Sequence, residues 1–179
     1  MKTLTLLRHA KSGWDDPVAR DFDRPLNAKG HRAAQAVGRQ LRTLGVTFDH
    51  VIASPAQRVV ETIAGVADGY GSAIAPAWDK RLYLASAATL LDVARESPAD
   101  AARVLMIGHN PGLEDFVLLL LDGGEPDLIA AAEEKYPTAT VAELTFDVDD
   151  WAQIAAGGGT LTRFIRPRDL DPALGPDED

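Results

Sequence analysis

Two short apolar runs, each followed by a histidine, constrain the fold of this chain more than any other feature. Residues 4–7 are Leu-Thr-Leu-Leu and lead into Arg8 and His9, while residues 104–107 are Val-Leu-Met-Ile and lead, one glycine later, into His109. Runs of this length and composition are typical of strands buried on both faces of a sheet. The chain is therefore expected to place two chemically active side chains at the ends of buried strands.

The rest of the chain alternates strand-like and helix-like segments. Strands are expected at 2–8, 50–53, 74–78, 103–108, 141–146 and 160–165, and helices at 28–44, 55–68, 87–95, 110–121 and 126–134. Asn27, Ser54 and Ser86 are placed to cap the helices that follow them. This alternation predicts an α/β protein, a three-layer α/β/α sandwich with a mostly parallel central sheet. Ligands bind beyond the carboxyl ends of such strands, where His9, Ser54 and His109 are expected to meet.

The length of 179 residues fits a single core. We expect one domain over residues 1–166 and an acidic, flexible tail over residues 167–179, which are rich in proline and aspartate. The apolar run at residues 118–121 is expected in the core.

Composition excludes several classes of function. The absence of cysteine excludes disulfides and thiolate metal sites. A net charge of −9 argues against nucleic acid and anionic membranes as partners. No apolar stretch approaches the roughly 20 residues that span a bilayer, and the chain starts directly in a strand-like run. We therefore expect a cytoplasmic protein.

Against this acidic background, three arginines near the expected site are informative. Arg8 precedes His9, Arg24 lies in a long loop, and Arg58 lies one helical turn beyond Ser54. The rigid donor fork of arginine suits phosphate oxygens, so phosphate is the best-matched ligand. A histidine in a phosphate pocket can act as a nucleophile when it is neutral, and flanking arginines favour the neutral form.

Three motifs in this order resemble those of the histidine phosphatase superfamily, which includes cofactor-dependent phosphoglycerate mutase. They are the segments Leu7-Arg8-His9-Ala10, Ser54-Pro55-x-x-Arg58 with Glu61-Thr62, and Gly108-His109-Asn110-Pro111-Gly112. Within the superfamily, the chain looks most like the phosphohistidine phosphatase branch, the SixA type. The likeness lies in the sequence Arg-His-Ala-Lys-Ser at residues 8–12, in the compact length and in the segment 21–26. The resemblance covers about residues 1–165 and implies a phosphoglycerate mutase-like fold.

The resemblance also implies roles for the motif residues. His9 would be the nucleophile, and Arg8, Arg58 and His109 would bind the phosphoryl oxygens and stabilise the transition state. Further contacts to phosphate or substrate would come from a second group of side chains: Arg24, Ser12 and Asn110. The scheme needs no metal and no cofactor, because arginines take the place of a cation.

The chain departs from the family pattern in its proton donor. Members that act on phosphate esters usually carry a Glu or Asp after the third strand, whereas residues 79–85 offer no acid beyond Asp79. An alkoxide leaving group needs such a donor, and an imidazole leaving group needs far less help. Asp21 or Asp23, from the long loop, remains a possible donor in this scheme.

The favoured function is therefore a metal-independent phosphatase that acts through a phosphohistidine intermediate on phosphohistidine in a protein, such as a phosphorelay or phosphotransfer protein. Two alternatives stay open at this point. One keeps the site but takes a small phosphate ester as its substrate. The other is a non-catalytic module that binds phosphoproteins.

Overall fold

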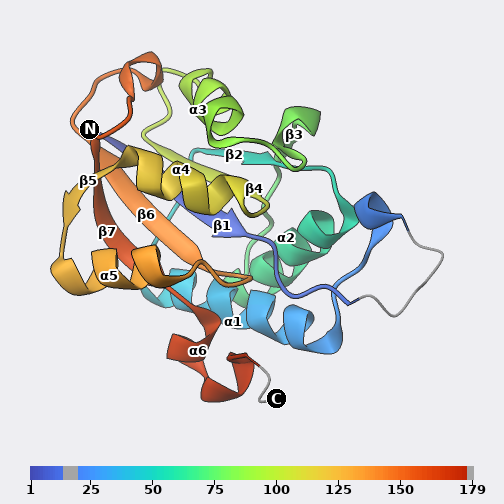
Figure 1. Ribbon diagram of the computed structural model, residues 1–179. Coiled ribbons are helices and arrows are strands. Elements are labelled where there is room, and N and C mark those ends of the chain that lie inside the picture. Colours follow the sequence, from blue (N-terminus) through green and yellow to red (C-terminus); the bar gives the residue numbers. More distant parts are fainter. Residues whose placement is uncertain (14–19, 177–179) are drawn as a thin grey trace.

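The chain folds around a single central sheet. The computed structural model describes residues 1–13 and 20–176. Within them a seven-stranded sheet runs through the molecule (Figure 1). Its strands are β1 (Lys2–Arg8), β2 (His50–Ala53), β3 (Ala77–Trp78), β4 (Arg103–Gly108), β5 (Leu121–Gly124), β6 (Val141–Phe146) and β7 (Gly159–Ile165).

The strands follow the order β3-β2-β4-β1-β6-β7-β5. The pairs β2–β3, β2–β4, β1–β4 and β5–β7 are parallel, and β6 runs antiparallel to both of its neighbours. The prediction of an α/β fold with a mostly parallel central sheet is confirmed. Because β2, β4 and β1 are adjacent and parallel, their carboxyl ends meet at one edge.

Helices cover both faces of this sheet (Figure 1). They are α1 (Ala28–Thr43), α2 (Gln57–Tyr70), α3 (Ala87–Arg95), α4 (Gly112–Leu120), α5 (Pro126–Glu134) and α6 (Pro167–Leu170). Short 3-10 turns lie at η1 (Asp21–Asp23), η2 (Lys80–Leu82), η3 (Trp151–Gln153) and η4 (Pro172–Leu174). Apolar residues of α1 and α2 form one core with the sheet, and those of α3, α4 and α5 form the other.

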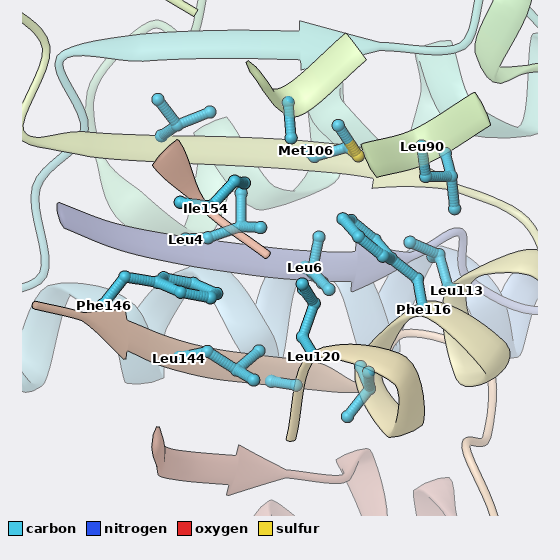
Figure 2. Close-up of a cluster of buried hydrophobic side chains, with 14 of the residues drawn as sticks. Leu4, Leu6, Leu90, Met106, Leu113, Phe116, Leu120, Leu144, Phe146 and Ile154 are labelled. Atoms are coloured by element: carbon cyan, nitrogen blue, oxygen red, sulfur yellow. The ribbon is translucent and has the colours of Figure 1, made fainter. Parts of the chain in front are cut away.

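Strand alternation divides the core between the two faces. Leu4 and Leu6 of β1 pack with Phe116 and Leu120 of α4 on one face, as Figure 2 shows. Leu7, on the opposite face of β1, joins the core beneath α1 and α2. Burying each of these side chains contributes roughly 1.5–3 kcal/mol. The strand that carries the first histidine is thus held rigidly from both sides.

Two of the three predicted helix caps are confirmed. Asn27 Oδ1 accepts a hydrogen bond from Gly30 N at 2.8 Å, and Ser86 Oγ accepts one from Thr89 N at 3.3 Å. The cap predicted at Ser54 is wrong, because α2 begins three residues later, at Gln57, and its N-cap residue makes no side-chain capping bond. Ser54 is fully buried just after β2, and its hydroxyl contacts Ala56 N and His109 rather than a backbone N–H within α2.

The apolar run at residues 118–121 is only partly in the core. Leu118 and Leu119 are 41% and 38% exposed, whereas Leu120 is fully buried. Four consecutive residues extend beyond the single apolar stripe that a helix can bury, so two of them face outward.

The chain after residue 166 is more regular than expected. Pro167 is buried and starts α6, and Arg166 forms an ion pair with Asp169 at 2.9 Å that closes its first turn. Both α6 and η4 contact α1. Local pairing and a buried proline thus give residues 167–170 and 172–174 helical turns, in a segment whose composition indicated disorder.

Candidate active site

Strand register brings the two predicted histidines together. In the parallel pairing of β1 with β4, Arg8 lies opposite Gly108, so the next residue on each strand, His9 or His109, leaves the sheet at the same level. The backbone N–H of His9 donates to Gly108 O at 3.1 Å. The two imidazole ring centroids are 5.3 Å apart. Two residues one hundred positions apart in the sequence are thus neighbours.

Ser54 joins this pair from the other side of β4. The register of β2 with β4 sets Ala53 opposite Ile107, and Ser54 N donates to Ile107 O at 3.1 Å. The Ser54 hydroxyl then lies 2.8 Å from His109 Nε2. The expectation that these three strand ends share one edge is confirmed.

Arg8 and Arg58 approach the histidines from β1 and from the first turn of α2. Arg8 Nη1 donates to Tyr136 O at 3.0 Å, which fixes the guanidinium beside the strand end. Arg58 is only 2% exposed. Its Nη1 donates to the backbone oxygen of Asp21 at 2.7 Å, and its Nη2 lies 3.1 Å from the Asp21 carboxylate.

His9 is held as a neutral imidazole. Burial is the largest cause that lowers its pKa to about 3, the hydrogen bond to Ala10 opposes this shift, and electrostatic interactions with His109, Arg8 and Arg58 lower the pKa further. His9 Nδ1 lies 2.7 Å from Ala10 O. A carbonyl oxygen can only accept, so Nδ1 carries the proton and donates it to Ala10. The lone pair of the neutral ring is therefore on Nε2.

His109 is neutral for related reasons. Burial lowers its pKa to about 3, the charge of Arg58 adds to this effect, and the carboxylate of Asp21 opposes it. Its Nδ1 is buried and has no hydrogen-bond partner among residues 1–13 and 20–176. A buried nitrogen without a partner is costly in a folded protein, so this atom calls for a structural or functional explanation.

Thr62 supports the turn that carries His9, a role that the sequence did not indicate. Its hydroxyl accepts from Ala10 N at 2.9 Å and donates to Arg58 O at 2.6 Å. One side chain of α2 thus ties the backbone after the first histidine to the helix that carries the second arginine. Alanine at position 10 is fully buried, so there is little room for a larger residue there.

Asp21 and Tyr83 form a polar group beside the histidines. The Tyr83 hydroxyl donates to the Asp21 carboxylate, which also accepts from Arg24 Nε at 3.2 Å. The Tyr83 ring lies edge-on to His109 with centroids 5.4 Å apart. Burial raises the pKa of Asp21, but the hydrogen bonds from Tyr83 and Arg58 and the nearby charges outweigh it and lower the pKa. Asp21 is therefore an ionised acceptor, and Arg24 reaches the site through it.

The remaining residues predicted for the site form hydrogen bonds or ion pairs within the protein. Ser12 Oγ donates to Pro25 O at 2.8 Å. Asn110 donates to Tyr136 O at 3.0 Å, the same carbonyl that holds Arg8. Asp23 pairs with Arg20 at 2.8 Å.

Within residues 1–13 and 20–176, no group of three or more His, Cys, Asp or Glu side chains could hold a metal ion. In the same part of the chain, no helix has the length and apolar character needed to cross a membrane.

The comparisons with known proteins agree with the geometry of this site. The family model described as histidine phosphatase superfamily (branch 1) matches residues 4–83. An uncharacterised protein of Mycobacterium tuberculosis is 32% identical over 165 residues, which cover 90% of this chain and all of that protein.

Two solved structures resemble nearly the whole chain. A candidate phosphohistidine phosphatase SixA from Nakamurella multipartitia is 31% identical, with a TM-score of 0.77 over 93% of this chain and 96% of that one. A candidate phosphohistidine phosphatase SixA from Agrobacterium tumefaciens is 26% identical, with a TM-score of 0.75 over 93% and 98%. The fold is thus that of the phosphoglycerate mutase-like phosphatases. The chain belongs to the histidine phosphatase superfamily, in its SixA-type group, and is a phosphatase.

Proposed function

We propose that this phosphatase removes phosphoryl groups from phosphohistidine in a protein, through a phosphoenzyme formed on His9. The observation that carries the proposal is the state of His9. Its pKa is lowered to about 3, its proton is engaged by Ala10, and the lone pair on Nε2 remains to attack phosphorus. Arg8 and Arg58 supply positive charge beside it.

The reaction has two displacements at phosphorus. In the first, His9 Nε2 forms a bond to phosphorus while the bond between phosphorus and the substrate imidazole breaks, and that imidazole leaves with the electron pair. In the second, water attacks phosphorus, the bond to His9 breaks, and inorganic phosphate is released. Arg8 and Arg58 bind the oxygens of the transferred group in both steps.

His109 is proposed to donate one hydrogen bond to the same group. The Ser54 hydroxyl accepts from Ala56 N at 3.3 Å and lies 2.8 Å from His109 Nε2, to which it would give its own proton in this scheme. The proton of neutral His109 is then on Nδ1, the buried nitrogen without a partner among the described residues. A phosphoryl oxygen would satisfy that donor.

The choice of phosphohistidine over a phosphate ester rests on the state of the nearby carboxylates. Asp79 is ion-paired with Arg81 at 2.8 Å, and hydrogen bonds from Arg81 lower its pKa despite burial. Asp21 is held ionised by Tyr83 and Arg58. Carboxylates that stay ionised cannot protonate an alkoxide, whereas a phosphorylated imidazole can already carry the proton that its departure needs.

The contacts refine the roles of the weaker candidates. Asn110 would act as a positioning residue, because its amide and Arg8 share the Tyr136 carbonyl. Arg24 would act through Asp21. The arginine charge takes the place of a metal ion in this scheme, so we expect turnover to persist in EDTA. The physiological partner would be a phosphorylated protein of the phosphotransfer kind.

Rapid quench with a ³²P-labelled phosphohistidine peptide tests the proposal. The wild type should accumulate an acid-labile, base-stable phosphoenzyme, and His9→Ala should not. His31→Ala, which removes an imidazole from the surface of α1, is the matched control and should behave as the wild type. Turnover without a phosphoenzyme, or turnover retained in His9→Ala, would contradict the mechanism. Faster turnover of alkyl phosphates than of phosphohistidine would assign the site to esters.

A further inference from the structure

A basic cavity of about 220 Å³ lies beside the catalytic cluster. It is bounded by the end of β1, the first turns of α1, the segment after α5, and the chain around α6 and η4, which lies against α1 in Figure 1. Six cationic residues line this basic cavity: Arg8, Lys11, Lys29, Lys135, Arg166 and Arg168. Among the described residues, no Asp or Glu forms part of its wall.

The positive charge around this cavity contrasts with the negative net charge of the whole chain. The protein has a net charge of −9, yet six of its 18 lysines and arginines surround one small cavity. Like charges held close together repel one another, so an anion would lower the energy of the arrangement.

Part of this charge is already engaged. Arg166 pairs with Asp169, Lys29 donates to Gly175 O, and Arg8 donates to Tyr136 O.

Two of the lining arginines also have one unsatisfied donor each. The Nε atoms of Arg8 and Arg168 are buried and have no hydrogen-bond partner within residues 1–13 and 20–176. Both residues line the basic cavity, one from β1 and one from α6. Buried guanidinium donors are normally satisfied, and oxygen atoms of carboxylates or phosphates are their strongest acceptors.

Arg8 connects the basic cavity to the chemistry. It lines the cavity and also lies in the cluster around His9, where its charge acts on the imidazole. A group bound in the cavity would therefore be close to a phosphoryl group bound at His9. The volume equals that of about seven water molecules, which is enough for one small charged group and far too little for a folded partner.

We propose that the basic cavity binds a second anionic group of the phosphorylated substrate, a carboxylate or a phosphate, while the phosphoryl group lies at His9. This inference rests on the proposed function for the identity of the reacting group. It adds a selectivity for substrates that carry negative charge next to the phosphorylated position. The cavity then acts on substrate binding rather than on the chemical step.

The test compares two phosphohistidine peptides that differ only in two residues next to the phosphohistidine, glutamate in one and glutamine in the other. The enzymes are the wild type, the double variant Lys135→Gln with Arg168→Gln, and Arg103→Gln as the matched control. Arg103 is exposed at the start of β4, at the opposite end of that strand from His109. Lys135→Gln alone changes an exposed side chain and serves if the double variant does not fold.

The wild type and Arg103→Gln should show a KM about fivefold to tenfold lower for the acidic peptide. The double variant should lose this preference with kcat within about twofold of the wild type, and Lys135→Gln should lose part of it.

A pair of small phosphoramidates, one with a carboxylate and one without, identifies the source of the anion. Preference for charge among peptides indicates an acidic side chain, and preference among small substrates indicates a charged metabolite. The absence of charge preference in both pairs, or its persistence in the double variant, would overturn the inference.

Failure of the proposed function would look different. In that case neither the wild type nor any of the variants would turn over a phosphoramidate. The cavity is then tested by calorimetric binding of the unphosphorylated glutamate peptide to the wild type and to the double variant. Binding weakened fivefold or more by the double variant supports the anion site, and equal binding refutes it.

Discussion

Because His9 is neutral in the folded protein, we expect the free energy of unfolding to fall in mild acid by an amount that can be calculated. The folded protein holds the pKa of His9 at about 3, while an unfolded chain returns it to about 6.5. Between these values the unfolded state binds one proton more than the folded state. Stability therefore rises with pH across this window, and it falls as the pH is lowered below about 6.5.

The size of the effect follows from the two pKa values. Lowering the pH from 6.5 to 5 should cost about 2 kcal/mol of unfolding free energy through His9 alone, since one pH unit corresponds to about 1.4 kcal/mol per proton. His109, whose pKa is also lowered to about 3, should add a similar amount. The loss would be large against the roughly 5–15 kcal/mol of a typical domain.

Urea denaturation at several pH values between 5 and 6.5 measures this effect, with the fluorescence of the fully buried Trp151 as the signal. The wild type should lose stability more steeply than His9→Gln by about 1 kcal/mol per pH unit averaged over this range, because the imidazole of the unfolded chain is only half protonated at pH 6.5. In the double variant His9→Gln with His109→Gln, the unfolding free energy should depend on pH less steeply still, by a similar difference in slope. If the unfolding free energies of the wild type and of His9→Gln changed in parallel with pH, the conclusion that His9 is buried and neutral would be refuted.

Two further substitutions test how the site is supported. Ser54→Ala removes the partner of His109 Nε2 and should slow phosphoenzyme formation about tenfold in rapid quench, equivalent to about 1.4 kcal/mol, and an unchanged rate would refute its positioning role. Gly30→Ala would place a Cβ atom 2.1 Å from Lys11 O and should lower the unfolding free energy by about 1–3 kcal/mol in urea. The control Gly123→Ala has nothing within 4 Å of the new atom, so equal losses in the two variants would contradict the packing argument.

The strand ends of the site could be predicted from the sequence because they depend on local patterns. Short apolar runs that end in polar residues indicate buried strands, and parallel strands bring their carboxyl ends to one edge. That reasoning located His9, Ser54 and His109 on a common edge before any strand order was known. The roles of these residues in the reaction remain predictions.

Other parts of the site depend on contacts that no local pattern reports. Ser54 before a proline resembles a helix cap, yet its partner His109 is 55 positions away. Arg58 and Glu61 have the i, i+3 spacing of a helical ion pair, yet Glu61 instead lies 3.4 Å from His31. Asp21 accepts from Arg58 across 37 positions of sequence, a contact that no local spacing indicates. Tyr83 stands in no motif at all, so the sequence offered no signal for it.

Asp21 gives Arg58 an internal counter-ion, with a consequence for turnover in the proposed reaction. A buried arginine without a negative neighbour would destabilise the protein, and the Asp21 carboxylate removes that penalty for Arg58 while no substrate is bound. In the proposed reaction, arriving phosphate meets a guanidinium that is already desolvated and oriented, so binding does not have to bury it. When hydrolysis is complete, the same carboxylate would compensate the charge that departing phosphate leaves behind. Release of phosphate would then leave no uncompensated charge on Arg58.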